Sequence, residues 1–407
     1  MRTISRSVAL ALVSAALLLA ACSSPASPPA NSPTTGSATG TPVATTTATP
    51  AASMAATPAA PLKPMRPGAI APPASGCYIG VFRPPGPFNR AAMASYSAVS
   101  PKPPAIVMWY QQWGTHGAYK FDPAMVAAVY ARGSVPMISW EPWDPGSKPH
   151  NIKDPADSPE WRLSRIAAGS KDAFIRSWAR SIKALGGPVM LRPMHEMNGN
   201  WYPWSGTMNG NQPQDYIAAW RHIHDVFAQE GATNVTWVWS VNYVSKPFSV
   251  ENTAAAYYPG DKYVDWVSAS GFNWGKSITG VPFKSFDDIF ISPLLYLKSL
   301  GKPILIGECA AVEQGGDKPA WLTQTYANLA TEHPEIGAFV YYDAYEKGVK
   351  HGIQDWRIQS SKASAAAYRK AVSAPYMLGG PIPELAAWKK GLSAADKKRL
   401  ASYPHLY

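Results

Sequence analysis

Charged residues are few in this chain. They make up 15% of its 407 residues, although their balance gives a net charge of +11. The sequence contains no run of lysine and arginine of the kind that binds the phosphates of a nucleic acid. The basic clusters near the C-terminus, Lys389 with Lys390 and the three residues at 397–399, are typical of a solvated helix. We therefore expect no nucleic-acid partner, and we expect the chain to act as a monomer.

Recognisable metal and cysteine motifs are also missing. His195 and Glu196 begin like a zinc-binding helix motif, but Gly199 stands where the second histidine belongs. Cys309 lacks the ordered histidine and asparagine signal of a cysteine nucleophile, so a small buried packing residue is the better interpretation. The sequence thus predicts no metal and no cofactor.

The chain opens with the features of an export signal. Arg2 and Arg6 precede an apolar run at 8–21, which is too short to span a bilayer comfortably. The run ends in Leu-Ala-Ala before Cys22, as at a bacterial lipoprotein processing site, where the signal peptide (1–21) is cut and the cysteine takes the lipid. The alternative is an ordinary secretory signal with a chance cysteine. We expect export across the cytoplasmic membrane and a lipid anchor on Cys22 at the cell surface or envelope.

Residues 22–75 lack the composition of a folded segment. After the cysteine they are rich in Pro, Thr, Ala and Ser, hold no aromatic residue, and carry only two charges, Lys63 and Arg66. Such a segment buries too little apolar area to offset its chain entropy, so we expect a disordered linker. We expect one large domain at 76–376, followed by an extension at 377–407 whose role the sequence does not show.

Eight short apolar runs rich in valine, isoleucine and aromatic residues recur along the chain, and helical patterns that end at glycines such as Gly186 separate most of them. Strands that are apolar on both faces and alternate with helices imply a parallel sheet. Eight repeats in about 300 residues predict an α/β fold, the (β/α)8 TIM barrel. A doubly wound open sheet is the alternative, but the glycine-rich first turn is missing. Export permits a disulfide between Cys77 and Cys309, yet this topology places them at opposite ends of the barrel. The expected strands are residues 78–83, 105–110, 135–140, 189–193, 235–240, 264–268, 303–307 and 337–342, and the expected helices are residues 122–132, 171–185, 214–229, 287–300, 320–331 and 361–372.

The active site of such a barrel lies at the carboxyl ends of its strands. There the fourth strand delivers Glu196 and the seventh delivers Glu308, from nearly opposite sides. Glycoside cleavage needs one carboxyl that protonates the leaving oxygen and a second that attacks or activates water, so we expect this pair to be catalytic. For either glutamate alone, the alternative to a catalytic role is a structural salt bridge to an arginine. The aromatic run at 201–204 follows Glu196 and is expected to stack on sugar rings, and the alternative is that it forms a hydrophobic plug in the loop. The neighbouring residues expected to bind substrate are His195, Arg192, Asn198, Trp201, Trp204, Trp140, Phe272, Trp274 and Tyr341.

These strand ends resemble glycoside hydrolase family 26, the β-mannanase family of retaining barrel enzymes. The strongest match is Arg-Pro-Met-His-Glu-Met-Asn-Gly-Asn-Trp-Tyr-Pro-Trp at 192–204. The resemblance covers roughly residues 76 to 376. It implies that Glu196 is the acid/base, Glu308 the nucleophile, His195 a contact to the sugar at the cleavage point, and Trp201 an aromatic in the cleft. Supporting motifs lie at 257–261, 264–266, 301–308 and 355–357.

The sequence departs from the family pattern at two positions. Members commonly have a tyrosine where Phe272 stands, and its hydroxyl hydrogen-bonds the nucleophile. Tyr341 occupies a position often held by tryptophan. Both changes put the mannan specificity in doubt more than the fold.

The leading hypothesis is a retaining endo-β-glycanase that hydrolyses β-1,4-mannan by double displacement. A β-1,3-xylanase or a mixed-linkage β-glucanase is an alternative within the same family. A non-catalytic carbohydrate-binding lipoprotein on a degenerate barrel is an alternative from another class, which Phe272 favours and the retention of both glutamates disfavours. A solute-binding lipoprotein would need two doubly wound lobes, which the eight-strand pattern contradicts.

Overall fold

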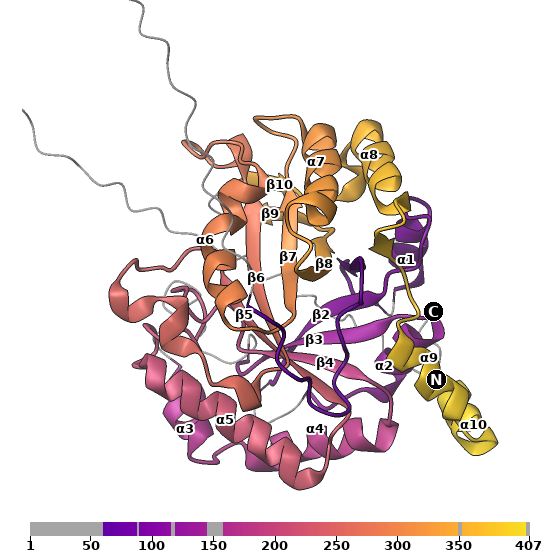
Figure 1. Ribbon diagram of the computed structural model, residues 1–407. Coiled ribbons are helices and arrows are strands. Elements are labelled where there is room, and N and C mark those ends of the chain that lie inside the picture. Colours follow the sequence, from indigo (N-terminus) through magenta and orange to yellow (C-terminus); the bar gives the residue numbers. More distant parts are fainter. Residues whose placement is uncertain (1–59, 88, 115–118, 145–157, 349–351, 404–407) are drawn as a thin grey trace, which may run out of the picture. The chain divides into compact units, whose positions relative to one another are not determined.

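The structure, a computed structural model, describes residues 60–87, 89–114, 119–144, 158–348 and 352–403 (Figure 1). Eight parallel strands pair in sequence order, and the pairing of β1 with β8 closes the sheet into a barrel. Each overlaps one of the predicted apolar runs, so the (β/α)8 fold is confirmed. The barrel strands are β1 Cys77–Phe82, β2 Ile106–Gln112, β3 Val135–Glu141, β4 Val189–Pro193, β5 Val235–Asn242, β6 Trp266–Asn273, β7 Ile304–Ala311 and β8 Ile336–Tyr342. Beyond β8, the strands are β9 Tyr345–Gly348, β10 Gly352–Asp355 and β11 Met377–Leu378.

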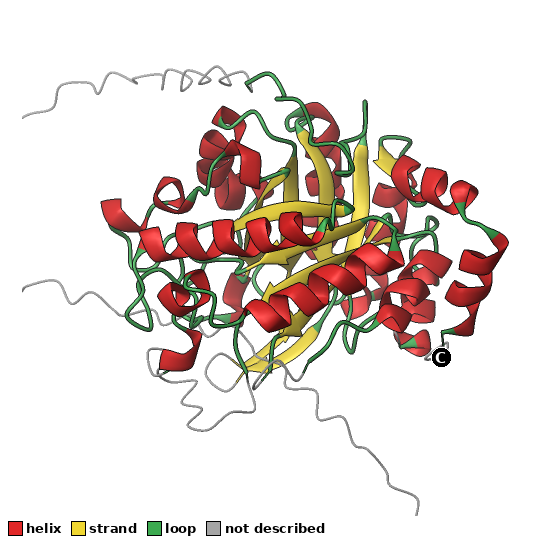
Figure 2. Ribbon diagram, turned by 90° about the horizontal axis from the view of Figure 1, so that it is seen from below, coloured by secondary structure: helices red, strands yellow, loops and turns green. Residues whose placement is uncertain are grey.

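Helices surround the strands, as Figure 2 shows. All six predicted helices are present, and the backbone turns left-handed at the glycines expected to end them, with φ of 81° at Gly186 and 70° at Gly231. The sequence does not predict α1 and α3, because each is short and buries only two side chains. The helices are α1 Arg90–Ser97, α2 Pro123–Ala131, α3 Leu163–Ala167, α4 Asp172–Leu185, α5 Pro213–Glu230, α6 Phe286–Ser299, α7 Lys318–Thr331, α8 Lys362–Ser373, α9 Pro383–Gly391 and α10 Ala394–Ser402.

Side chains of each strand alternate between the barrel interior and the surrounding helices. At the end of β3, Trp140 points outward and packs against Trp113 and Trp178, with ring centroids 4.5 and 5.0 Å apart. Its neighbours Ser139 and Glu141 point inward, where Ser139 accepts a hydrogen bond from the arginine of β4. This alternation decides which side chains at the strand ends can face a ligand.

The two cysteines of the barrel lie apart, as expected. Cys77 begins β1 and Cys309 lies near the end of β7. Both are buried, and neither forms a disulfide within the described residues.

The described residues extend before the expected domain boundary at residue 76. Residues 60–75 cross the amino ends of β5 and β6, where the Trp266 indole donates to the Ile70 carbonyl at 2.8 Å and Arg66 pairs with Asp265 at 3.0 Å. The Ile70 side chain is buried. The prediction of a disordered linker is therefore wrong for residues 60–75, because composition does not reveal that the barrel offers them an apolar surface and hydrogen-bond partners. The rest of the predicted linker and the signal peptide lie outside the described residues.

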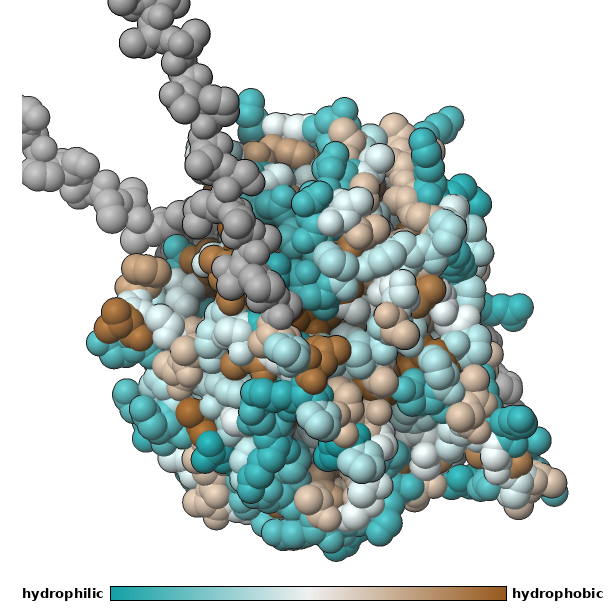
Figure 3. Space-filling view, viewed as in Figure 1, coloured by the Kyte–Doolittle hydropathy of each residue, from teal (hydrophilic) through white to brown (hydrophobic). Residues whose placement is uncertain are grey.

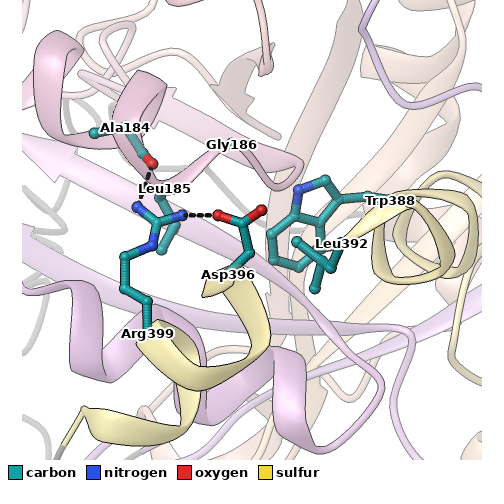
Figure 4. A pocket seen from close by; sticks show the side chains of 8 residues that line it. Ala184, Leu185, Gly186, Trp388, Leu392, Asp396 and Arg399 are labelled. Carbon is teal, nitrogen blue, oxygen red and sulfur yellow. Dashed lines mark hydrogen bonds and ion pairs between the residues drawn. The ribbon is translucent and has the colours of Figure 1, made fainter. Parts of the chain in front are cut away.

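The C-terminal extension also covers this end of the barrel. Strand β11 pairs with the start of β1, and α9 and α10 pack at the C-terminal end of α4. In the pocket between them, Arg399 donates to the Ala184 carbonyl at 2.8 Å and pairs with Asp396 at 3.2 Å (Figure 4). Cations near the last carbonyls of a helix are stabilising, which gives this extension a structural role. No helix in the described part of the chain is both long and apolar enough to cross a membrane.

Candidate active site

The tip of β4 carries an unusual backbone. Met194 and Glu196 have φ of 49° and 54°, which are left-handed values that residues other than glycine seldom adopt. Backbone bonds from Met194 to Trp140 and from Glu196 to Ser240 fix this path, at 3.1 and 2.8 Å. Such strain of roughly 1–3 kcal/mol per residue clusters at functional sites. Here it turns Glu196 over the end of the barrel.

Arg192 and Glu308 form a buried ion pair inside the barrel. The Arg192 guanidinium donates to a Glu308 carboxylate oxygen and to the Ser139 hydroxyl, and it lies 3.4 and 3.3 Å from the hydroxyls of Ser240 and Ser270. The Arg192 side chain has no exposed surface, and that of Glu308 is 5% exposed. A charge-assisted bond of this kind fixes the orientation of the carboxylate. Arg192 was expected to bind substrate, but its burial makes it a support for Glu308 instead.

Glu196 lies in a different environment. Its carboxylate accepts a hydrogen bond from the Trp201 indole at 3.0 Å and is almost completely buried. Burial raises the pKa of Glu196 above its usual value, and the negative charge of Glu308 raises it further, against the lowering effects of Arg192 and Trp201. The two glutamates therefore interact electrostatically, and the raised pKa of Glu196 favours its protonated form.

His195 lies next to Glu308 and Tyr202. Its Nε2 atom is 4.0 Å from Glu308 and 3.2 Å from the Tyr202 hydroxyl, and its Nδ1 atom has no hydrogen-bond partner among the described residues. Burial holds the pKa of His195 well below its usual value, and the nearby Arg192 lowers it further. The imidazole is therefore neutral near pH 7, and burial leaves its unpartnered Nδ1 atom almost no exposed surface.

A third carboxyl group faces the same space from β3. Glu141 accepts hydrogen bonds from the side chains of Gln112 and Trp143. Burial raises the pKa of Glu141 to about 7, and the charge of Glu308 contributes to the rise. The sequence identifies this strand end but does not single out Glu141 as a site residue.

An aromatic wall stands at the ends of β6 and β8. Phe272 packs against Trp274, Tyr342 and Trp356, with ring centroids 5.8, 5.2 and 5.1 Å apart. The Tyr342 hydroxyl and the Trp356 indole both donate to Glu346 of β9. The structure thus brings the expected residues Phe272 and Trp274 to the strand ends. Phe272 offers no hydroxyl to Glu308, and Arg192 supplies the hydrogen bond to that carboxylate.

Four residues expected to bind substrate are enclosed by protein. Trp140 packs behind β3, and Trp204 stacks on Tyr202 while its indole donates to the His195 carbonyl at 2.8 Å. The Tyr341 hydroxyl donates to the Trp356 carbonyl at 3.0 Å from the outer side of β8. Asn198 joins the β4 loop to the backbone of Asn242. All four are corrections, since their burial leaves almost no surface for a sugar.

Tyr110 and Tyr342 are aromatic residues at this end that the sequence does not single out, and Tyr202, from the aromatic run at 201–204, joins them. Tyr110 packs against His195 at a centroid distance of 5.6 Å, and the charge of Glu308 acts on all three hydroxyls. The signal that could have found Tyr342 is strand alternation, which places it inside when Tyr341 is outside. Among the described residues, no group of histidine, cysteine and carboxylate side chains is arranged to hold a metal ion.

A closed (β/α)8 barrel with two buried carboxyl groups of unlike environment at the ends of β4 and β7 has the architecture of a glycoside hydrolase. The family model described as "Glycosyl hydrolase family 26" matches residues 124–290, which include Glu196. The resemblance seen in the sequence is thereby confirmed, and the chain is a family 26-like protein.

Individual relatives agree with this placement. "Endoglucanase H" of Acetivibrio thermocellus is 37% identical over 307 residues, which cover 74% of this chain and 31% of that protein. The chain therefore spans about a third of the length of that relative. "Mannan endo-1,4-beta-mannosidase" of Bacillus subtilis strain 168 is 24% identical over 157 residues, or 36% of this chain and 42% of that protein. The structure of a GH26 beta-mannanase from Bacteroides ovatus superposes with a TM-score of 0.55 at 19% identity, covering 77% of this chain and 93% of the other, which supports the barrel fold.

Proposed function

We propose that the protein is a retaining endo-β-glycanase in which Glu308 is the nucleophile and Glu196 the general acid/base. The observation that carries the proposal is the contrast between the two carboxyl groups. Glu308 is ion-paired with Arg192, whereas the Glu196 carboxyl has an indole as its side-chain partner and a raised pKa. Two carboxyl groups in such unlike environments are the arrangement that separate acid and nucleophile roles require.

The proposed reaction has two steps. A carboxylate oxygen of Glu308 attacks the anomeric carbon, and the bond to the leaving sugar breaks as Glu196 donates its proton to the leaving oxygen. The products are a glycosyl ester on Glu308 and a shortened chain with a new hydroxyl. Glu196, now ionised, takes a proton from water, and the water oxygen attacks the same carbon and releases Glu308. Two inversions retain the anomeric configuration.

We propose β-1,4-mannan as the first substrate. Support comes from the number of relatives whose names specify mannan, including proteins of Caldalkalibacillus mannanilyticus and Piromyces sp. A β-glucan is the second candidate, because "Endoglucanase H" aligns over far more of this chain than the mannanases do. That alignment covers only 31% of "Endoglucanase H", and the name describes that whole, longer protein rather than the aligned part. A β-1,3-xylan is a third candidate, since two β-1,3-xylanases match shorter stretches.

One experiment tests the reaction and the substrate together. The protein is incubated with β-mannan, β-1,3-xylan, mixed-linkage β-glucan and cellulose, and the anomer of the first product is followed by proton NMR. The proposal expects internal cleavage of one of these polymers with the β-anomer formed first. An α-anomer first would contradict double displacement. Binding to a polymer without cleavage would instead favour the carbohydrate-binding alternative.

We also propose that Cys22 carries lipid and that the mature protein is anchored at the cell surface or envelope. The support is the basic, apolar and Leu-Ala-Ala-Cys pattern of the N-terminus. Metabolic labelling with a fatty-acid analogue should label the wild-type protein and not Cys22→Ser. Lipid label on the variant would contradict the proposal.

A further inference from the structure

Both terminal segments of the described chain lie at the amino end of the barrel. Residues 60–75 cover the starts of β5 and β6, and the Ala71 amide in this segment donates to Glu384 of α9 at 2.9 Å. The glutamates of the active site lie at the opposite, carboxyl end of the strands. Residue 60, whose amide donates to the Lys298 carbonyl near the end of α6, therefore lies on the side of the domain away from the glutamates.

The helices α9 and α10 present unpaired cations at this same end. Two of their cations are used by the fold, since Lys389 donates to the Tyr130 carbonyl and Arg399 to that of Ala184. The side chains of Lys390, Lys397 and Lys398 are exposed and have no hydrogen-bond or ion-pair partner in the part of the chain that the structure describes. Hydrophilic side chains are visible on the projection at the lower right of Figure 3, where Figure 1 places α10.

We infer that the exposed lysines of α9 and α10, Lys390, Lys397 and Lys398, here called the basic face, dock on the anionic headgroups of the membrane that holds the lipid anchor. Cys22 precedes residue 60 by 38 positions, so the anchor keeps the face within reach of the bilayer. An anionic membrane leaflet attracts lysine side chains that lie near it. A lipid chain combined with a basic patch therefore binds a membrane more stably than either does alone. The docked domain holds its cleft away from the bilayer, open to a polymer. The inference rests on the proposed lipid anchor, but its test does not.

Flotation with vesicles tests the basic face directly. The chain without residues 1–22 keeps every described residue and lacks lipid. It is mixed with vesicles of phosphatidylcholine alone or with a third of phosphatidylglycerol, in 0.05 and 0.5 M salt. We expect binding to the anionic vesicles at low salt only, because screening weakens attraction between exposed charges. The triple variant K390Q/K397Q/K398Q should lose at least about tenfold in affinity for these vesicles. The three corresponding lysine-to-arginine changes keep the charge and should preserve binding.

A matched variant separates this face from general positive charge. K120Q/K276Q/K347Q removes three exposed lysines that follow the carboxyl ends of strands, and we expect its vesicle binding to stay unchanged. Equal loss in both triple variants, or no binding of the parent to anionic vesicles, would overturn the inference. So would binding to an anionic cell-wall polymer without binding to vesicles. Failure of the enzymatic proposal would appear separately, as absent turnover of soluble polymer by the same unlipidated chain.

Discussion

The two ends of the barrel are built in opposite ways. The carboxyl end holds Glu141, Glu196 and Glu308 with one buried arginine, and the backbone of β4 is strained there. At the amino end the two terminal segments cover the strand starts with buried apolar side chains, hydrogen bonds and cations at helix ends. The buried glutamates gather at one end, and the contacts that hold the two terminal segments gather at the other. The comparison teaches that substitutions at the first end should cost activity and changes at the second should cost stability.

The largest effect is expected from Glu308→Ala. Without the nucleophile no glycosyl ester forms, so turnover should fall by more than the 10²–10⁴-fold typical of losing a general acid. Turnover of the preferred polymer, measured alongside the melting temperature, checks this. Activity within about tenfold of wild type would show that the catalytic nucleophile lies elsewhere.

Glu196→Ala should have the next largest effect. Loss of proton donation should slow polymer cleavage by about 10²–10⁴-fold, because a sugar leaving group needs its oxygen protonated. The loss should be much smaller in the first step with an aryl glycoside, whose leaving group needs little protonation. An equal loss on both substrates would argue against the acid role.

Removal of residues 60–75 should lower stability and leave the site chemistry intact. The deletion uncovers Trp266 and the pocket of Ile70, and breaks the Arg66–Asp265 pair. Loss of one buried isoleucine alone costs about 2–5 kcal/mol when it is truncated to alanine. Urea unfolding of this deletion should show a loss of at least that size, whereas deletion of residues 23–59 serves as the control and should show none. Equal unfolding free energies of the two deletion variants would mean that residues 60–75 do not stabilise the barrel.

The smallest effect concerns pH. The pKa of Glu196 is raised, and its protonated form is the active acid, so activity should be lost as pH rises through this raised pKa. The Trp201 indole donates to the ionised carboxylate and lowers the pKa. Trp201→Phe should therefore move the alkaline limb of kcat/KM to higher pH. A shift to lower pH would show that Glu196 is not the group that titrates.

The positions of the eight strands and of both glutamates could be predicted because they depend on local patterns. Apolar runs and glycine ends are readable along the chain, and the motif at 192–204 is long. Which side of a strand a residue faces is harder, since a shift of one residue reverses it. The sequence therefore predicts Trp140 and Tyr341 in the cleft, whereas their neighbours Glu141 and Tyr342 are the residues that face it.

Two other features depend on contacts between distant parts of the chain. The packing of Ala69 and Ile70, the two buried residues of the segment at 60–75, requires the surface formed by β5 and β6, which no pattern within a proline-rich segment reveals. The ion pair of Arg192 with Glu308 joins residues 116 positions apart. The sequence predicts both residues in the site, but it assigns the arginine to the substrate.

The most direct test of the account is azide rescue of the two alanine variants on an aryl β-glycoside. In Glu196→Ala the glycosyl ester on Glu308 should accumulate, and azide should release it as a β-glycosyl azide from the face where Glu196 activates water. In Glu308→Ala azide should not give that product. If azide instead restored Glu308→Ala with an inverted, α-configured product and left Glu196→Ala unchanged, the roles proposed for the two glutamates would be contradicted.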